Sequence, residues 1–309
     1  EEDIDLVYIA TPPFLHYEQS KMALLADKHV ICEKPAALKM EHAAELQSLA
    51  EMHLKLYVVN LMQRYNPLYE VVKNIIEGKL LGNFLHGFFE NYASDENLKE
   101  DHWFWDESKS GGIFIEHGVH FFDMFSGWLG EGKLVSSLQL RRPSISKVIF
   151  DRVQAIVNYE AGPVSFYHGF DQPNMLDRQE MRLQFERGEV SLYGWIPVKC
   201  KIYGLLREDE VKAITSMLNN FSVIFETERK GSTKSVKGRF KDVVYEEELT
   251  LEFGSLDEKL TRYKEILKRM LEDQWKWIKD RNRGRAITGR NGVDSLKIAQ
   301  EAARNAIKY

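Results

Sequence analysis

The sequence predicts an α/β unit, half of a doubly wound parallel sheet, followed by an α+β region with one broad, mostly antiparallel sheet. Three observations predict this fold class. Strand-like and helix-like segments alternate through residues 1–60, strand patterns dominate between residues 150 and 195, and helical patterns close the chain. The 309 residues suffice for two domains, at about 150 residues each.

The opening segments are short and separated by short loops, which predicts parallel strands joined by helical crossovers. In order they are a strand at 6–10, a helix at 15–26, a strand at 29–32, a helix at 41–53 and a strand at 57–60. The buried-type strand Leu6–Ala10 begins almost at once, in a chain without an initial Met. We therefore expect upstream sequence, roughly 60 residues, that would supply the other half of the doubly wound sheet.

The next segments change character. We predict a helix at 68–78, a strand at 85–92, a polar and aromatic loop at 93–110, and a helix at 113–129. Alternation then predicts strands at 153–159, 164–170, 180–184 and 189–193, the first two forming a hairpin across Ala161-Gly162. Helices at 256–280 and 294–308 close the chain.

The stretch Glu226–Lys241 is locally basic. We predict a solvated hairpin loop there. A polyanion site is the alternative, which the overall charge disfavours.

Composition narrows the class of protein. With 44% hydrophobic and 29% charged residues, the chain can bury a core. Its 42 Lys and Arg against 47 Asp and Glu give a net charge of −5, which argues against nucleic-acid binding by bulk charge. No apolar run approaches the roughly 18 residues of a membrane span. The two cysteines, Cys32 and Cys200, cannot make a disulfide framework, and no signal peptide opens the chain, so we expect a cytoplasmic protein.

Ligands of open parallel sheets bind at the carboxyl ends of the strands, where two motifs lie. Thr11-Pro12-Pro13 with His16 follows the first strand, and Thr11 could hydrogen-bond a ribose or phosphate; the same residues also make an ordinary helix entry. Glu33-Lys34-Pro35 follows the second strand. A lysine there is either a pocket residue with tuned proton affinity or a solvated side chain beside a helix start.

A third cluster runs from Gly111 to His120. On a helix, Glu116 and His120 are four residues apart and share a face, so the carboxylate could orient the imidazole for acid–base chemistry. His117 and His120 are three apart, as in some metal pairs, but no further ligand follows at a recognised spacing, and we expect no metal. The alternative is a buried helix with satisfied histidines.

These motifs, taken in order, resemble the glucose–fructose oxidoreductase / inositol dehydrogenase (Gfo/Idh/MocA) family. The segments that carry the resemblance are 7–13 with His16, 33–35, 64–67, 77–82, 111–120, 194–197 and 288–292. The most specific are Glu33-Lys34-Pro35 and the later Gly118-Val119-His120.

The resemblance implies a division of the chain. Residues 1–62 would be the C-terminal half of a Rossmann domain, and residues 63–289 a substrate-binding and oligomerisation domain with a large open sheet. A helix within 290–309 would pack back on the Rossmann part. A broad sheet with one uncovered face favours a homodimer or homotetramer.

The resemblance also implies NAD or NADP as cofactor and a sugar or polyol as substrate. Lys34 and His120 match the catalytic lysine and histidine of the family. Glu116, the third catalytic candidate, stands where the family usually has Asp. Pro35 is expected after a cis bond, and Arg64 matches a position that often faces substrate. The expected cofactor contacts are Thr11, Pro12, His16, Glu33 and Lys34, and the expected substrate contacts are Arg64, Tyr92, Trp103 and His117.

The function that follows is hydride transfer between a nicotinamide and a secondary alcohol of a sugar or cyclitol. His120 would take the hydroxyl proton, Lys34 would donate to the same oxygen, and Glu116 would orient His120 or pair with Lys34. No Gly-x-Gly-x-x-Gly loop opens a helix in the sequence. The alternatives are a non-catalytic NAD(P)- or sugar-sensing regulator, an NAD-dependent glycoside hydrolase, and a fragment that is inactive by itself.

Overall fold

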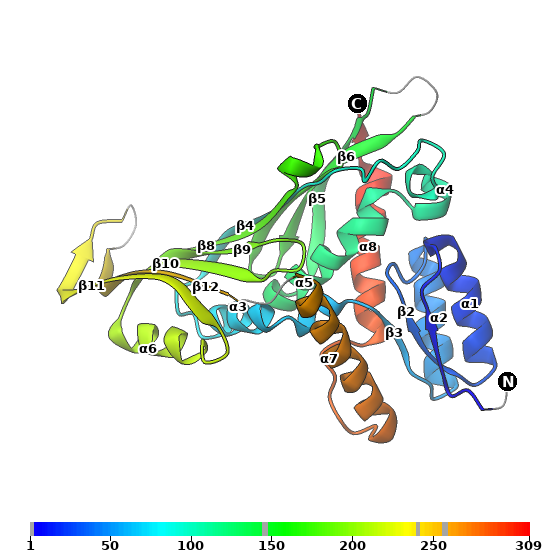
Figure 1. Ribbon diagram of the computed structural model, residues 1–309, viewed down its shortest axis with the longest axis horizontal. Helices are drawn as coiled ribbons and strands as arrows, with labels where there is room; N and C mark the ends of the chain where they lie inside the picture. Colours follow the sequence, from blue (N-terminus) through cyan, green and yellow to red (C-terminus); the bar gives the residue numbers. More distant parts are fainter. Residues whose placement is uncertain (1–2, 144–147, 239–241, 255–258) are drawn as a thin grey trace.

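The computed structural model describes residues 3–143, 148–238, 242–254 and 259–309. Its described strands form two sheets, a small parallel one near the N-terminus and a large, mostly antiparallel one (Figure 1). This arrangement confirms the predicted fold class.

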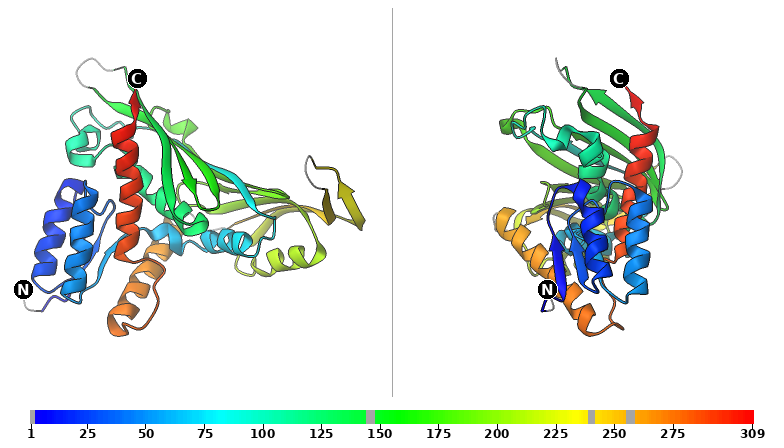
Figure 2. Two further views of the ribbon diagram at one scale, coloured as in Figure 1. Left: turned by 180° about the vertical axis from the view of Figure 1, so that it is seen from behind. Right: turned by 90° about the vertical axis from the view of Figure 1, so that its right-hand side faces the viewer.

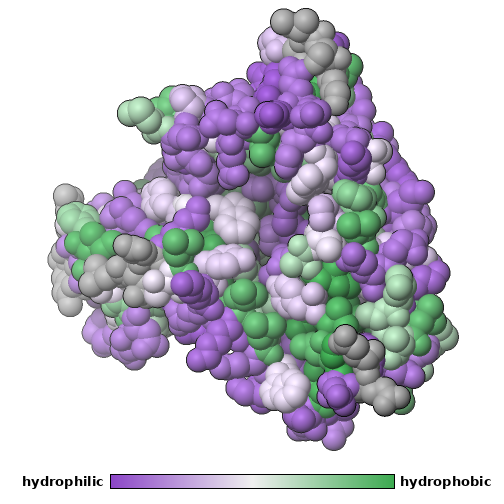
Figure 3. Space-filling view, turned by 45° about the vertical axis from the view of Figure 1, so that its right-hand side comes forward, coloured by the Kyte–Doolittle hydropathy of each residue, from purple (hydrophilic) through white to green (hydrophobic). Residues whose placement is uncertain are grey.

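The small sheet contains β1 (Leu6–Ile9), β2 (His29–Cys32) and β3 (Tyr57–Val59) in that spatial order, all parallel. Helices α1 (Pro13–Leu25) and α2 (Met40–Met52) connect them. The apolar residues of β2 and β3 are buried, whereas in β1 only Ile9 is buried and Tyr8 is exposed, so the expectation of a buried first strand was wrong. The predicted alternation of strand and helix is confirmed. Among the described residues β1 is an edge strand, and hydrophobic side chains gather on the face where this part of the molecule comes forward (Figure 3).

Within the described residues, the large sheet has ten strands. They are β4 (Phe84–Tyr92), β5 (Gly132–Arg141), β6 (Phe150–Tyr159), β7 (Gly162–Gly169), β8 (Arg178–Phe185), β9 (Gly188–Tyr193), β10 (Lys199–Leu206), β11 (Ser222–Val236), β12 (Val243–Gly254) and β13 (Ile307–Lys308). Their spatial order is β11-β12-β10-β9-β8-β4-β7-β6-β5-β13. The pairs β4–β7 and β5–β13 are parallel and the others antiparallel, and β6–β7 is the predicted hairpin.

One face of the large sheet packs on helix α5 (Val119–Leu129) through aromatic side chains. Phe121 of α5 stacks on Phe89 of β4 at 3.6 Å between ring centroids, and Phe122 and Phe125 meet Phe166 of β7 edge-on. Burial of several such rings supplies a large hydrophobic contribution and fixes the helix on the sheet. Helix α5 carries the candidate histidine His120, so this packing also positions the site.

Helix α8 (Gly289–Asn305) lies between the two sheets (Figure 2). The Gln300 side chain accepts a hydrogen bond from the backbone N–H of Met40 at 2.8 Å, which joins α8 to the N-terminal part. The carbonyl oxygen of Ala302 accepts one from Ser137 of β5 at 2.8 Å. A Cβ atom at Gly292 would lie 2.5 Å from Val59 Cγ2, so only glycine permits this close approach. Helix α8 therefore contacts both parts of the chain.

The remaining elements are shorter or peripheral. They are η1 (Met62–Tyr65), α3 (Pro67–Glu77), η2 (Trp103–Trp105), α4 (Glu107–Ser110), η3 (Phe114–Gly118), η4 (Asn174–Leu176), α6 (Glu208–Ser216) and α7 (Lys259–Lys279). No described helix combines the length and the apolar composition that a membrane span requires.

Several predicted boundaries were wrong. Strand β11 covers most of Glu226–Lys241 because this stretch pairs with β12, so it is not a loop; residues 239–241 lie outside the described part. The last helix begins at Gly289 and ends at Asn305, since Ile307 and Lys308 pair with β5. The predicted start of the helix at 256–280 also lies outside the described residues.

Candidate active site

Lys34 and Glu116 join the N-terminal part of the chain to the helix that precedes α5. Lys34 follows β2 and its peptide bond to Pro35 is cis, as predicted. Its Nζ donates to the backbone carbonyl oxygen of Glu116 at 2.6 Å and also to the Glu116 carboxylate. Both side chains are mostly buried. An ammonium group has three N–H donors, so one remains for a ligand.

The helical segment that carries Glu116 is not a regular α-helix. Residues Phe114–Gly118 form the π-helical segment η3, and the α-helix starts at Val119. Short π segments inside helices occur frequently at functional sites. The predicted helix over 113–129 is confirmed in its extent, but its first part is π-helical, so the expected one-face alignment of Glu116 with His120 does not follow from α-helical spacing here. Glu116 pairs with Lys34, the second of the two roles expected for it.

His120 is buried beside this ion pair, with 3% of its surface exposed. Burial lowers the pKa of His120 well below its usual range, and the nearby charge of Lys34 lowers it further. The ring is therefore neutral at neutral pH and has one nitrogen lone pair. Trp195 contacts the ring edge-on at 5.4 Å between centroids. Within the described residues, His120 Nδ1 has no hydrogen-bond partner.

Beside these residues is a cavity of about 460 Å³, a volume typical of a small-molecule site. Glu116, His117 and Trp103 are among its lining residues, as is Trp195. The cavity therefore brings two of the predicted substrate contacts, Trp103 and His117, together with the catalytic candidate Glu116. We call it the Glu116 cavity.

His117 has a partner that the sequence did not identify. Its Nδ1 lies 3.0 Å from Nδ1 of His168 on β7. Burial lowers the pKa of both rings, that of His168 to about 3. Tyr167 and His168 are neighbours on one strand, so only one of them can face the site. The sequence gives no basis for deciding which of the two does. The structure places His168 on the side of His117.

Tyr92 lies on the opposite face of the large sheet. Its ring is 5.1 Å from that of Tyr167 and 4.8 Å from the Arg178 guanidinium, whereas its neighbour Asn91 lines the Glu116 cavity. Successive side chains of a strand point to opposite faces. The structure therefore does not bring Tyr92 to the other predicted substrate contacts.

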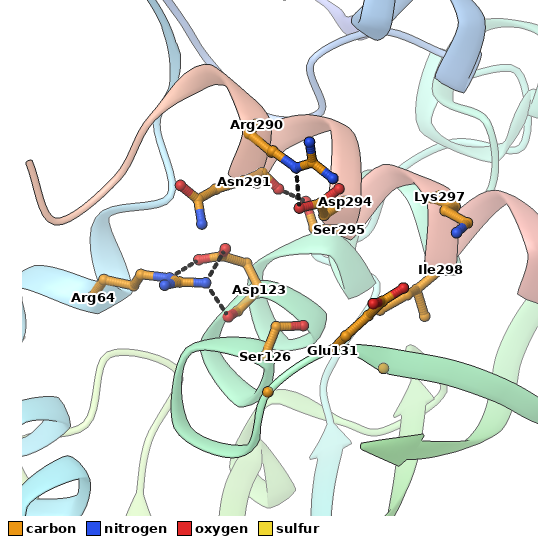
Figure 4. A pocket seen from close by; sticks show the side chains of 12 residues that line it. Arg64, Asp123, Ser126, Glu131, Arg290, Asn291, Asp294, Ser295, Lys297 and Ile298 are labelled. Atoms are coloured by element: carbon orange, nitrogen blue, oxygen red, sulfur yellow. Dashed lines mark hydrogen bonds and ion pairs between the residues drawn. The ribbon is translucent and has the colours of Figure 1, made fainter. Parts of the chain in front are cut away.

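Arg64 points into a second cavity, of about 350 Å³, beside the start of α8 (Figure 4). Its guanidinium group donates to both carboxylate oxygens of Asp123, at 2.8 and 2.7 Å, and to the Asp123 carbonyl oxygen at 2.9 Å. Asp123 is buried. Arg64 is thus held as one half of an ion pair and is not among the residues that line the Glu116 cavity.

The residues expected to contact a cofactor lie at the carboxyl edge of the small sheet. The ring of His16 is fully buried, and its two nitrogens each lie 2.7 Å from a carbonyl oxygen, of Thr11 and of Pro35. His16 therefore links the loop after β1 with the loop after β2. The Thr11 hydroxyl donates to Gln19 at 2.7 Å, and Pro12 caps α1.

Glu33 connects the ends of all three strands of the small sheet. Its carboxylate accepts hydrogen bonds from Tyr8 at 2.5 Å and from Asn60 at 2.9 Å. Asn60 is buried, and its Oδ1 lacks a partner in the described part of the chain.

A nicotinamide cofactor fits these residues in part. The unpartnered Asn60 oxygen and the spare donor of Lys34 are polar groups at the edge where open parallel sheets bind ligands. They suit the end of a dinucleotide that lies beside a substrate. Amides of a glycine-rich loop, which would hold the pyrophosphate, are not supplied by this sequence.

Two sequence models of one family match the chain. The oxidoreductase family with an NAD-binding Rossmann fold (GFO_IDH_MocA) matches residues 1–61, and the GFO/IDH/MocA C-terminal domain matches residues 69–191. An uncharacterized oxidoreductase of Synechocystis sp. is 29% identical over 53% of this chain and 43% of its own length. Glucose-6-phosphate 3-dehydrogenase of Bacillus subtilis is 29% identical over 38% of this chain and 34% of its own length. The chain thus spans less than two thirds of the length of these curated relatives.

The fold is similar to that of solved structures. KijD10, a 3-ketoreductase from Actinomadura kijaniata in complex with NADP and TDP-benzene, has a TM-score of 0.71 at 12% identity, covering 100% of this chain and 80% of that chain. At this identity the likeness shows the fold. The two matching sequence models together cover more than half of the chain and show that it belongs to the GFO/IDH/MocA family of oxidoreductases.

Proposed function

We propose that the full-length protein is an NAD(P)-dependent oxidoreductase that interconverts a secondary alcohol of a sugar or cyclitol and the corresponding ketone. One observation carries this proposal. Lys34, from the end of a strand in the small parallel sheet, meets Glu116 beside the buried His120, and Glu116 itself lines a cavity of small-molecule size. The names of two similar proteins, a 3-dehydrogenase of a sugar phosphate and a 3-ketoreductase, support the same type of reaction.

The roles of the side chains follow from their protonation states and donors. His120, neutral because it is buried next to a cation, accepts the hydroxyl proton of the alcohol. Lys34 directs its remaining N–H to the same oxygen and stabilises the negative charge that develops there. Glu116 holds the ammonium group in place through its carboxylate and its carbonyl oxygen.

The cofactor, when bound, supplies the hydride chemistry, and the chain supplies position and charge. Glu33 and Asn60 would hold its nicotinamide end at the carboxyl edge of the small sheet, with Lys34 beside it. The Lys34 ammonium group, held there by Glu116, favours an anionic oxygen next to this edge.

The Glu116 cavity suits a sugar or cyclitol ring. Aromatic side chains of Trp103, Phe104 and Trp195 line it and can cover the apolar faces of such a ring. Asn91, Asp177 and Gln179 are among the polar lining residues and can bind peripheral hydroxyl groups. Aromatic walls with a few polar groups that fix orientation are characteristic of small-ligand sites.

The test is a cofactor-reduction assay of the full-length protein with NAD and NADP against a panel of inositols, aldoses and their derivatives. We expect reduction with at least one member and its loss in Lys34→Ala. Binding of NAD(P) without reduction by any substrate would contradict the proposal in favour of a sensing protein. Cleavage of an aryl glycoside that requires NAD but yields no net NADH would contradict it in favour of a hydrolase.

A further inference from the structure

His117 and His168 form a pair of buried imidazoles at the wall of the Glu116 cavity. Only 9% of His117 and none of His168 is exposed. Their Nδ1 atoms are 3.0 Å apart, a hydrogen-bond distance, and the rings are nearly perpendicular at 82°. Because His117 also lines the cavity, the nitrogen it has left for a ligand is Nε2.

The pair holds one shared proton between the two Nδ1 atoms. Burial lowers the pKa of both rings, and the charges of His168, Lys34 and His120 lower that of His117 further. Both rings are therefore neutral at neutral pH, and each carries a single N–H. A contact between two Nδ1 atoms then requires that one of them donates and the other accepts.

The surroundings of His168 indicate which of the two Nδ1 atoms carries the proton. Its Nε2 is buried and has no hydrogen-bond partner in the described part of the chain, and the rings of Phe89 and Phe121 pack against it. If His117 donated, His168 would bury an Nε2–H group without an acceptor. If His168 donates from Nδ1, only a lone pair is left unpartnered. Buried N–H groups without a partner are rarer than under-satisfied acceptors, so the second arrangement is favoured.

We propose that His168 donates from Nδ1 to His117, fixes His117 in the tautomer protonated at Nε2, and thereby makes His117 a hydrogen-bond donor to a substrate oxygen. His117 is then a binding residue and His168 its positioning residue. The hydroxyl group that is oxidised faces Lys34 and His120. The oxygen bound by His117 would belong to another hydroxyl group of the sugar or cyclitol. This inference rests on the proposed function for the identity of the ligand.

The tautomer can be measured without catalysis. In full-length protein with isotope-labelled histidine nitrogens, NMR distinguishes a protonated from an unprotonated ring nitrogen, and His117→Gln assigns the signals. We expect His117 to be protonated at Nε2 and His168 at Nδ1. Protonation of His117 at Nδ1 would overturn the proposal, whether or not a substrate is known. Failure of the proposed function would show itself differently, as an absence of nicotinamide reduction by the wild type.

Kinetics test the consequence for substrate binding. In His168→Phe, which keeps an aromatic ring but removes both nitrogens, we expect KM for the sugar or cyclitol to rise on the order of 10-fold, the value of one hydrogen bond. We expect little change in kcat or in the KM of the cofactor. His168→Asn, whose side-chain amide can donate from a position similar to Nδ1, should restore most of the affinity.

The matched control is Tyr167→Phe, on the same strand but on the other face of the sheet. It should leave all three constants unchanged. An unchanged substrate KM in His168→Phe would overturn the inference. If His168→Phe does not fold, the NMR measurement on the wild type decides the question alone.

Discussion

Lys34 Nζ lies 2.6 Å from the carbonyl oxygen of Glu116, although the two residues are 82 positions apart in the chain. One follows a strand of the small parallel sheet, and the other lies in the π-helical segment η3 before α5. The proposed site therefore depends on how the two parts of the chain pack. Helix α8, which bonds to Met40 on one side and to Ser137 on the other, helps to hold that packing.

Lys34→Ala should abolish most of the turnover of the full-length protein. The variant removes the donor that stabilises the developing oxyanion, so kcat/KM should fall on the order of 10²- to 10³-fold, while the dissociation constant of NAD(P) changes little. Steady-state kinetics and cofactor-binding titrations measure the two quantities. Lys39→Ala, an exposed lysine in the same segment, is the control and should behave like the wild type. Unchanged turnover in Lys34→Ala would remove Lys34 from the chemistry.

Glu116→Asp should lower kcat even though the charge is kept. The shorter side chain withdraws the carboxylate from Lys34 by about one ångström, and a misplacement of that size can cost on the order of 100-fold in rate. Glu116→Gln, which keeps the length and loses the charge, should be impaired as well. Glu107→Asp, at an exposed glutamate, should have little effect. Wild-type kcat in both Glu116 variants would show that Glu116 does not position Lys34.

Buried histidines should make the protein less stable as the pH falls. The pKa values of His117, His120 and His168 are lowered by burial, so below about pH 6.5 the unfolded chain takes up protons that the folded protein does not. The stability these groups provide is complete above that pH and is lost as the pH falls toward their folded-state pKa values. Each group can cost at most about 1.4 kcal/mol per pH unit.

Denaturant unfolding at about pH 7.5 and about pH 5.5 measures this effect. The free energy of unfolding of the wild type should be lower at about pH 5.5 than at about pH 7.5. In His168→Phe, which lacks one of the three groups, this decrease should be smaller by about 1 kcal/mol. An equal fall in both proteins would show that His168 is not kept neutral in the folded state.

Asp123→Asn should destabilise the protein by about 3–5 kcal/mol, because it leaves the largely buried Arg64 guanidinium without its carboxylate. The double variant Arg64→Met with Asp123→Leu should recover most of this loss, since it removes both charges together. Equilibrium unfolding in denaturant measures all three proteins. A loss below about 1 kcal/mol in Asp123→Asn would mean that solvent replaces the carboxylate.

Much of the fold could be predicted because the local pattern of apolar and polar residues indicates many of the strands and helices. The alternation of apolar strands with helices in residues 6–60 determined the parallel sheet, and the period-two pattern of residues 153–170 determined the hairpin. The strand β11 could not be predicted in this way. From Glu226 to Ser235 its residues are polar, charged or glycine, and only pairing with β12 makes this stretch a strand, which shows how tertiary context overrides propensity.

Part of the candidate site could also be predicted. The sequence placed Lys34 at the carboxyl end of a strand and Glu116 on a later helix, and the structure brings them into contact. It could not show the π-helical segment at Phe114–Gly118, which changes the spacing between Glu116 and His120. The partner of His117 was equally hidden, because the choice between Tyr167 and His168 depends on which face of β7 packs against the helix.

A crystal structure of the full-length protein with NAD(P) and a substrate identified in the reduction assay would test the central claim most directly. We predict one alcohol oxygen within hydrogen-bond distance of both Lys34 Nζ and a ring nitrogen of His120. A substrate bound in the Glu116 cavity with no oxygen reaching Lys34, or bound elsewhere on the molecule, would contradict the account.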